Sequence, residues 1–425
     1  CSSDLTWMCF SLSAQKIIDL SGKWSFSIDR QDNGEKEKWF SHTLNDCINL
    51  PGSMPEKLKG DEVTAKTQWT GSLYDSSYYY NPYMEKYRKE GNIKFPFFLT
   101  PDKHYVGAAW YQKEVNIPAD WKGERILLFL ERPHIETTVW VNGQKTGMQN
   151  SLCVPHQYDI TRYVRPGKCT ITIRVDNRIK EINVGPDSHS ITDQTQGNWN
   201  GIVGRICLQT TPKTYFDDIQ IYPEPEQKLA RVKVVIKGAG ITKIKLSAES
   251  FNTDKKHIVP AIQQEIKLNK GVTETEMVLP MGNDMLLWDE FHPALYKLKA
   301  EVTNGKKTEI KEIQFGMRRF EIKGKWFYVN GRKTQLRGTV ENCDFPLTGY
   351  APMDVESWER VFRICRSYGL NHMRFHSFCP PEAAFIAADR VGFYLQPEGP
   401  SWPNHGPKLG LGQPIDKYLM DEDRK

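Results

Sequence analysis

Residues 369–399 read GLNHMRFHSFCPPEAAFIAADRVGFYLQPEG and alternate between short apolar runs and one helical stretch. Residues 370–375 have the length of a strand, and 393–395 form a second apolar run. Between them, residues 381–391 carry the proline start and glycine stop of a helix. Strands that alternate with helices are typical of parallel βαβ units. The stretch therefore predicts the second and third strands of an α/β unit.

The segment before this stretch predicts a helix over 354–368. Apolar residues recur there at spacings of three and four, which places them on one helical face. Asp354 is the expected N-cap, and Gly369 stands where a left-handed residue would end the helix. The apolar positions are Val355, Trp358, Phe362 and Cys365.

Polar residues cluster where each predicted strand stops, with residues 334–337 taken as the first strand of the series. In a (β/α) barrel the carboxyl ends of the strands carry the chemistry, so this placement indicates a functional site. For any single residue the alternative is a solvated charge at a strand end. The residues are Arg337, Glu341, Arg374, His376 and Glu398.

The first three quarters of the chain predict antiparallel sheets. Asn-Gly pairs at 142–143, 304–305 and 330–331 stand between β-branched runs and favour type I′ hairpins. Alternating strands at 23–28, 125–130 and 170–175 predict a jelly-roll sandwich over 16–212. Shorter strands at 219–222, 231–236 and 244–248 predict an immunoglobulin-like sandwich over 213–315.

Residues 69–105 are rich in aromatic side chains and lack periodicity. Tyr78, Tyr79 and Tyr80 stand at the centre of this segment. Long loops without regular structure are uncommon unless they serve a function. Two roles stay open for it, a contribution to a sugar site and packing between domains.

Composition excludes some partners. A net charge of +5 spread over 425 residues gives no concentrated basic face, so we expect no nucleic-acid partner. No run of eighteen apolar residues occurs, so we expect no membrane span. The 12 Trp and 18 Tyr suit sandwich cores or platforms for sugar rings.

Short motifs along the chain resemble those of glycoside hydrolase family 2, the β-galactosidase, β-glucuronidase and β-mannosidase group. They occur in the family's order and cover nearly the whole chain. The motifs are AWYQK (109–113), VWVNG (139–143), DIT (159–161), GIVGRI (201–206), LW (287–288), HPALY (292–296), FGMR (315–318), VNG (329–331) and LRG (336–338).

The resemblance implies a retaining glycosidase with two glutamates at the mouth of a TIM barrel, which such enzymes hold about 5 to 5.5 Å apart. Residues 316–425 correspond to only three βα units of that barrel, and residues 416–425 would lead toward the fourth strand. No Asn-Glu pair follows Glu398, so both catalytic glutamates are expected beyond Lys425. The fragment by itself is expected to be inactive.

The resemblance also implies pocket residues. His376 falls at the family's sugar-binding His, although Phe375-His376-Ser377 replaces the commoner Ser-His order. Glu398 matches a carboxylate that binds magnesium in β-galactosidases; with no second ligand visible we expect no cofactor, and a divalent cation there is the open alternative. Asn342 belongs to a departure from the family pattern Gly-x-Asn-x-His-x-Asp, which here reads Gly338, Val340, Asn342 and Asp344. The remaining candidates are Asp193, Trp199, Asn200 and Trp402.

The start of the chain predicts export. Residues 5–12 are apolar and 11–14 resemble a signal-peptidase site, so 1–15 are interpreted as a signal remnant of a periplasmic or secreted protein. A lipoprotein start with an acylated Cys1 is the alternative. The nine cysteines show no CxxC pair, and a disulfide between Cys153 and Cys169 stays open.

Three functions remain open. The first is a fragment of an exported family 2 glycosidase that binds carbohydrate, with homo-oligomerisation left open. The second is a carbohydrate-binding protein whose barrel has lost its chemistry. The third is an unrelated hydrolase that uses Cys379 or Ser377 as nucleophile and His376 as base.

Overall fold

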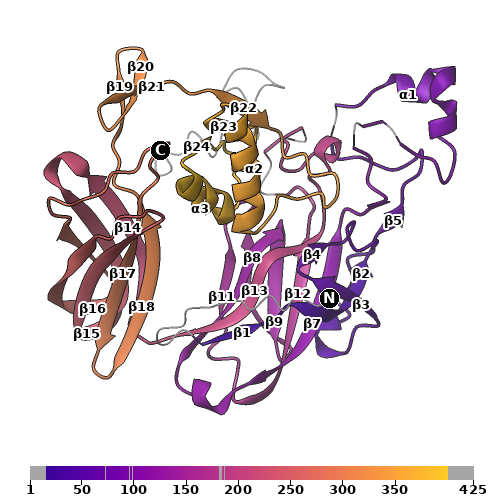
Figure 1. Ribbon diagram of the computed structural model, residues 1–425. Coiled ribbons are helices and arrows are strands. Elements are labelled where there is room, and N and C mark those ends of the chain that lie inside the picture. The colour runs from indigo at the N-terminus through magenta and orange to yellow at the C-terminus, as the bar shows by residue number, and fades with distance from the viewer. Residues whose placement is uncertain are drawn as a thin grey trace, which may run out of the picture.

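The computed structural model describes residues 16–71, 73–94, 96–97, 99–180, 184–185 and 187–400. They form two β-sandwiches and a smaller α/β unit that lies between them in Figure 1. The predicted signal remnant at 1–15, Trp402 and the expected helix at 416–425 lie outside the described residues.

The first sandwich consists of two antiparallel sheets that enclose the largest apolar core. Trp24, Tyr111 and Leu128 are each at most 1% exposed within it. The antiparallel sandwich predicted for this part of the chain is confirmed. One sheet has the order β10 (Gln144–Asn150), β9 (Glu136–Val141), β12 (Gly167–Asp176), β7 (Ala108–Ile117), β2 (Gly22–Asp29) and β3 (Asp46–Leu50). The other has β1 (Ile17–Asp19), β13 (Gly201–Thr211), β8 (Arg125–His134) and β11 (His156–Asp159), with β4 (Gly52–Ser53) paired to β13.

The second sandwich is built around two long strands. The strands predicted at 231–236 and 244–248 are the two halves of one strand, β15 (Leu229–Phe251), so the prediction of separate short strands is wrong. Register shifts at Gly238/Gly240 bend β15, and Gly240 has φ +88, which a side chain would disfavour. The other strands are β14 (Tyr215–Glu224), β16 (Ile258–Pro280), β17 (Leu295–Asn304) and β18 (Lys307–Phe315).

Two of the three predicted Asn-Gly turns have the expected backbone. Asn142 and Gly143 have φ +50 and +75, and Asn330 and Gly331 have φ +51 and +76, as a type I′ turn requires. At the third turn Asn304 pairs with Lys307, and of its Asn-Gly pair only Gly305 has positive φ. The type I′ prediction is wrong there because Asn304 still belongs to the strand. The third hairpin lies in the sheet of β19 (Phe320–Lys323), β20 (Trp326–Val329) and β21 (Arg332–Thr334).

The α/β unit has the alternation that the sequence predicts. Its three strands pair in parallel and in chain order, with a helix between each pair. The Asp354 side chain accepts a hydrogen bond from the Ser357 N–H at 2.8 Å, and Gly369 has φ +79, so both predicted helix boundaries are confirmed. The elements are β22 (Gly338–Glu341), α2 (Val355–Ser367), β23 (His372–Phe375), α3 (Glu382–Val391) and β24 (Tyr394–Gln396).

The first strand of this unit begins four residues later than predicted. Thr334 closes the antiparallel β20–β21 hairpin, where it pairs with Phe327. Strand β22 starts only at Gly338, so Arg337 precedes the strand instead of ending it. The prediction that Arg337 lies at a carboxyl end is therefore wrong.

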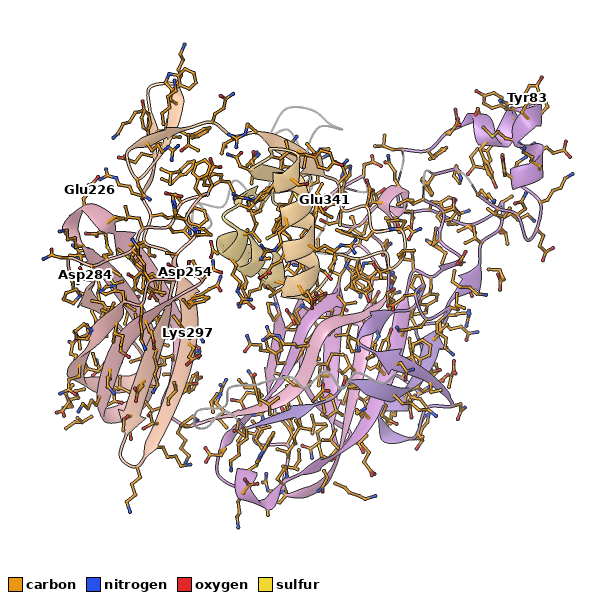
Figure 2. The ribbon with its side chains drawn as sticks, in the orientation of Figure 1. Tyr83, Glu226, Asp254, Asp284, Lys297 and Glu341 are labelled. Atoms are coloured by element: carbon orange, nitrogen blue, oxygen red, sulfur yellow. The ribbon has the colours of Figure 1, made fainter. Side chains whose placement is uncertain are left out.

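The described residues between 69 and 105 form an arm that projects from the first sandwich, at the upper right of Figure 1. Figure 2 shows Tyr83 at the tip of this arm, and Tyr80 and Tyr83 are 73% and 86% exposed. These two side chains do not pack between domains, while a contribution to a sugar site stays a prediction. The arm contains α1 (Ser77–Tyr80) and η2 (Pro82–Tyr87), and β5 (Asp61–Glu62) pairs with β6 (Lys103–His104) beside its base.

The remaining elements are single turns of 3-10 helix. In the described part of the chain no helix has the length and apolar character needed to cross a membrane. Cys153 and Cys169 are both free thiols, so the disulfide left open between them is not formed. The turns are η1 (Trp39–Ser41), η3 (Ala119–Trp121), η4 (Asp193–Thr195) and η5 (Pro225–Gln227).

Candidate functional site

A cavity of about 400 Å³ opens at the carboxyl ends of β22 and β23. The first sandwich contributes one wall, through the loop that ends in η4. The α/β unit contributes the other, through the residues that directly follow its strands. The lining residues are His189, Gln194, Thr195, Asn342, Asp344 and His376.

Glu341 ends β22 beneath this wall, in the α/β unit labelled in Figure 2. Its carboxylate accepts hydrogen bonds from the backbone N–H groups of Cys343 at 3.1 Å and Asp344 at 3.2 Å. Burial raises the pKa of Glu341 to about 7, against the opposing effect of these N–H groups. Cys343 has φ +63, an uncommon conformation for a side-chain-bearing residue, and it turns the chain sharply after the strand.

His376 follows β23 and is held from two sides. Its Nδ1 lies 3.1 Å from the Asn342 Oδ1, which joins the ends of the two strands. Its ring lies 4.4 Å from that of His189, edge to face. Burial and then the neighbouring His376 lower the pKa of His189, so this imidazole is neutral at pH 7.

Glu398 follows β24 and closes the edge of the site. It accepts hydrogen bonds from the Arg374 Nε at 2.5 Å and from the Ser377 N–H at 2.9 Å. Burial acts to raise the pKa of Glu398, but these two donors outweigh it and hold the pKa below its usual range. The carboxylate therefore fixes Arg374 and the turn at Ser377, which has φ +59.

The cavity presents hydrogen-bonding groups of modest charge. Amide, hydroxyl and imidazole groups from Gln194, Asn342, Thr195 and His376 can each donate and accept. Burial raises the pKa of Asp344, the one acidic lining residue. This chemistry suits a ligand with several hydroxyl groups, such as a sugar.

Three predicted site residues lie away from this cavity. Arg337 is at the amino end of β22, where its Nε donates to the Gly369 carbonyl at 2.8 Å. Asp193 is 1% exposed, accepts from the Thr70 N–H and lies 3.2 Å from the His104 Nε2. Asn200 bonds the Tyr111 hydroxyl and the carbonyls of Gly107 and Val175. The polar groups of these three residues hydrogen-bond to other groups of the protein, so a structural role accounts for them.

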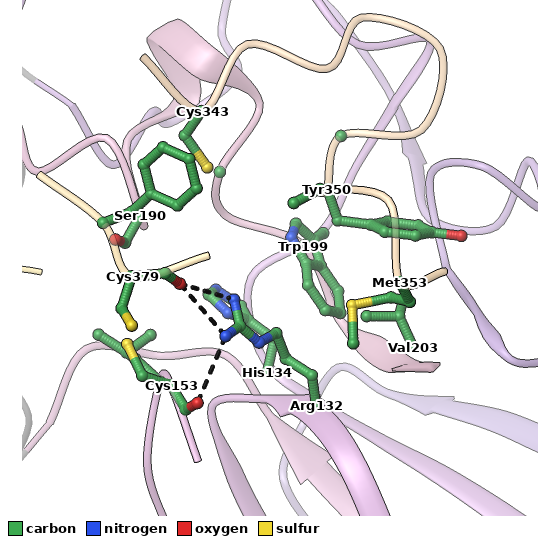
Figure 3. A pocket seen from close by; sticks show the side chains of 15 residues that line it. Arg132, His134, Cys153, Ser190, Trp199, Val203, Cys343, Tyr350, Met353 and Cys379 are labelled. Carbon is green, nitrogen blue, oxygen red and sulfur yellow. Dashed lines mark hydrogen bonds between the residues drawn. The ribbon is translucent and has the colours of Figure 1, made fainter. Parts of the chain in front are cut away.

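Trp199 lines a second cavity of about 40 Å³ between the first sandwich and the α/β unit, shown in Figure 3. Its ring stacks on His134 at 4.6 Å and lies 5.5 Å from Tyr350. The tryptophan is 5% exposed, so packing at this joint accounts for its position. Of the predicted residues, the structure thus brings together Glu341, Asn342, Arg374, His376 and Glu398.

Sequence reasoning missed the sandwich side of the cavity. His189, Gln194 and Thr195 belong to the same polar stretch as the predicted Asp193, directly before Gly201. The polar stretch was the signal that the sequence offered. The predicted residue, Asp193, is a chain neighbour of Gln194 and Thr195, which line the cavity. Asp193 points to the base of the arm instead.

The residues at Glu398 do not assemble a cation site. Each of its carboxylate oxygens already accepts a hydrogen bond from a protein donor. Across the residues the structure describes, no group of three His, Cys, Asp or Glu side chains could hold a metal ion.

Comparison with known proteins identifies both sandwiches. Residues 17–212 match the model described as glycosyl hydrolases family 2, sugar binding domain, and residues 214–318 match the model glycosyl hydrolases family 2. The sequence is 25% identical over 334 residues to a β-galactosidase of Thermoanaerobacter pseudethanolicus, covering 74% of this chain and 42% of that protein. It is 23% identical over 407 residues to a β-glucuronidase of Paenibacillus borealis, covering 91% and 59%.

Solved structures show the same fold. A glycosyl hydrolase family 2 member from Bacteroides cellulosilyticus superposes with a TM-score of 0.66 at 20% identity, covering 90% of this chain and 47% of that one. A Ruminococcus gnavus β-glucuronidase bound to uronic deoxynojirimycin gives 0.67 at 19%, covering 92% and 60%.

These matches follow the order of the domains along the chain and define a multi-domain protein with a sugar-binding sandwich. The chain belongs to glycoside hydrolase family 2. It spans about half the length of the curated relatives it matches.

Proposed function

We propose that the whole protein is a glycosidase that hydrolyses O-glycosidic bonds of oligo- or polysaccharides by a retaining mechanism. The observation that carries the proposal is the hydroxyl-suited cavity at the carboxyl ends of β22 and β23. Its position matches the active-site face of a (β/α) barrel, to which β22, β23 and β24 would contribute the first three strands.

The two catalytic carboxyl groups are expected to come from a part of the protein outside the described residues. Retaining hydrolysis needs one carboxyl group as acid and base and a second as nucleophile. At this edge Glu341 accepts from its own loop, and Glu398 is bound by Arg374 and Ser377. Each carboxylate is thus oriented toward groups of the protein itself, and neither Glu341 nor Glu398 is among the residues that line the cavity.

Within this scheme the described residues bind and orient the sugar. Asn342 and His376 hold each other at the wall of the cavity, where they would meet sugar hydroxyls. Glu398 acts through Arg374 and the Ser377 turn, so it is a positioning residue. Of the other predicted residues, Trp402 lies outside the described residues and keeps its proposed role as a stacking platform.

The second candidate is a non-catalytic carbohydrate-binding protein. It is favoured by the same engagement of Glu341 and Glu398, which leaves Asp344 as the one carboxyl group among the described lining residues, where retaining hydrolysis needs two. The nucleophile hypothesis is less favoured, because Ser377 is 2% exposed, and the Cys379 thiol donates to the Pro380 carbonyl and lines a different cavity from His376.

Export to the periplasm or the medium is also proposed, from the apolar run at 5–12, with acylation of Cys1 as the alternative anchor. Fractionation of the producing cells tests it, and recovery of the protein with the cytoplasm would contradict it. Homo-oligomerisation is left to light scattering of the whole protein.

The test is an assay of the whole gene product on a panel of nitrophenyl β-glycosides, with sugar binding measured in parallel. His376→Ala is expected to lower kcat/KM at least tenfold, because it removes a group that touches substrate. His292→Ala is the matched control, since that side chain is 83% exposed and far along the chain from the cavity. If kcat/KM is unchanged in His376→Ala, the substrate does not bind in this cavity. Sugar binding without turnover would favour the second candidate.

A further inference from the structure

Three free cysteines meet at the joint between the first sandwich and the α/β unit. Cys153 follows β10, Cys343 follows β22 and Cys379 follows β23. All three line the cavity of about 40 Å³ in Figure 3. Thiols from two domains that are far apart in the sequence therefore face one enclosed space.

Arg132 holds two of these cysteines at a fixed separation. Its Nη2 donates to the carbonyl of Cys153 at 3.3 Å and to the carbonyl of Cys379 at 3.2 Å. Its Nη1 donates to the Cys379 carbonyl as well, also at 3.2 Å. Because one nitrogen contacts both carbonyls, the two segments lie side by side at this point of the joint.

The side chains complete the geometry for one pair only. Figure 3 shows the sulfurs of Cys153 and Cys379 turned toward each other, while the Cys343 sulfur lies on the other side of Ser190. The backbone and thiol of Cys379 both act on the pKa of the Cys153 thiol, while the Cys153 thiol acts on that of Cys343 only through its charge.

The charges around the three thiols separate the same pair from the third. Burial raises the pKa of each thiol, and the Arg132 guanidinium acts in the opposite direction on all of them. For Cys343 the carboxylate of Glu341 adds to the effect of burial. Glu341 thus adds to the opposition to a thiolate at Cys343 and is not among the causes at Cys153 or Cys379.

We propose that Cys153 and Cys379 are an oxidation site whose disulfide links the first sandwich to the α/β unit. The oxidant class is a low-molecular-weight disulfide such as oxidised glutathione. One cysteine thiolate attacks it and releases one glutathione thiol; the second thiolate attacks the mixed disulfide, forms the protein S–S bond and releases the second. Two protein thiols are oxidised, and one glutathione disulfide is reduced to two thiols.

The bond would close a loop that contains the whole second sandwich. Crosslinks that close long loops restrict the unfolded chain strongly, so the oxidised protein should unfold at a temperature higher by about 5 °C or more. The link would also hold the turn after β23, which carries His376 and Ser377, against the sandwich. The inference does not depend on glycosidase activity.

The test treats the full chain with oxidised glutathione and counts free thiols, maps crosslinked peptides by mass spectrometry and records thermal unfolding. We expect the loss of two thiols, a peptide that joins Cys153 to Cys379, and a higher Tm that dithiothreitol reverses. Cys153→Ser and Cys379→Ser should each abolish all three changes.

Cys343→Ser is the matched control, because it removes the third thiol of the same cavity and should leave the crosslink intact. A crosslink through Cys343, a stable mixed disulfide with glutathione, or no loss of thiols would each overturn the proposal. Unfolding of the variants in urea, measured under reducing conditions, shows whether either serine changes the fold by itself.

Discussion

Glu341 is the titrating residue with the clearest consequence for stability. Its pKa rises from an ordinary value near 4.5 to about 7 because the side chain is buried beside the strand end. Below pH 4.5 the carboxyl group is protonated in both the folded and the unfolded chain. Between pH 4.5 and 7 only the unfolded chain gives up the proton, so folding becomes less favourable as the pH rises.

Glu341→Gln should remove this penalty, since a neutral amide keeps one acceptor for the loop and cannot ionise. We expect the variant to gain up to about 3 kcal/mol over the parent protein at pH 8 and little at pH 4.5. Urea unfolding at the two pH values measures the difference. Glu85→Gln on the exposed arm is the control, and an equal gain at both pH values would contradict the burial argument.

Helix α2 depends for its start on Asp354, the N-cap residue directly before it. The Asp354 side chain satisfies the Ser357 N–H, one of the donors that a helix leaves without an internal partner. Asp354→Ala should lower the free energy of unfolding by about 1 kcal/mol, whereas Asp354→Asn keeps the acceptor and should stay close to the parent protein. Equal losses in both variants, read by urea unfolding, would show that charge and not capping matters.

The arm at 69–105 is tied to η4 through Asp193. The carboxylate meets the Thr70 N–H and His104 at the two ends of the arm. Asp193→Ala leaves these buried groups without an acceptor, so we expect a loss of about 2 to 3 kcal/mol and faster proteolysis between residues 70 and 105.

Limited trypsin digestion followed by mass spectrometry measures the cleavage positions. Asp102→Ala, on the arm itself, is the control. Cleavage of the Asp193→Ala variant at the parent rate would show that the arm is anchored by other contacts.

Helices and turns whose boundaries are marked by residues within the element itself were predictable from the sequence. Asp354 and Gly369 bound a helix whose apolar residues follow one face, and Asn142-Gly143 sets the backbone of its own turn. The start of β22 was not predictable in this way, because 334–337 and 338–341 have similar alternation. The choice between them is made by the β20–β21 hairpin, which takes Thr334.

The residues of the candidate site also fall into those that local sequence patterns predict and those that they do not. Asn342 and His376 were predictable because each directly follows a strand, and the topology of parallel strands brings such residues to one edge. His189 was not, because it approaches His376 from a loop of another domain. A contact between residues that are so distant in the chain depends on how the two domains dock, which local patterns do not encode.

At the scale of the whole molecule, Arg366 joins the second sandwich to the α/β unit. Its Nη1 donates to the carbonyl of Glu290 at 2.6 Å and to those of Val391 and Gly392 at 3.1 and 2.8 Å. Nearby, the Trp288 Nε1 donates to the Asp389 carbonyl at 2.7 Å. Helix α2 therefore carries a side chain that connects the end of α3 to the other domain.

Arg366→Met should weaken the coupling of the two domains, since it keeps the apolar stem and removes the Nη1 donor to all three carbonyls, whereas the Trp288 hydrogen bond remains. We expect a single thermal transition to separate into two, with the α/β unit unfolding first. Differential scanning calorimetry makes the measurement. Arg363→Met is the control on the same helix, because its guanidinium pairs within α2, with Glu359 at 3.1 Å. A single transition in both variants would refute the coupling.

The two long strands of the second sandwich have a consequence for how that domain bears force. The first half of β15 pairs with β14, its second half pairs with β17, and β16 accompanies it along both halves. If the pairing register of β15 shifted by one residue in one layer, the register in the other layer would have to shift as well, because the same strand belongs to both. The two layers are thus connected by covalent backbone as well as by apolar contact. A force applied to one layer is transmitted directly to the other, so we expect the whole sandwich to unfold in one step.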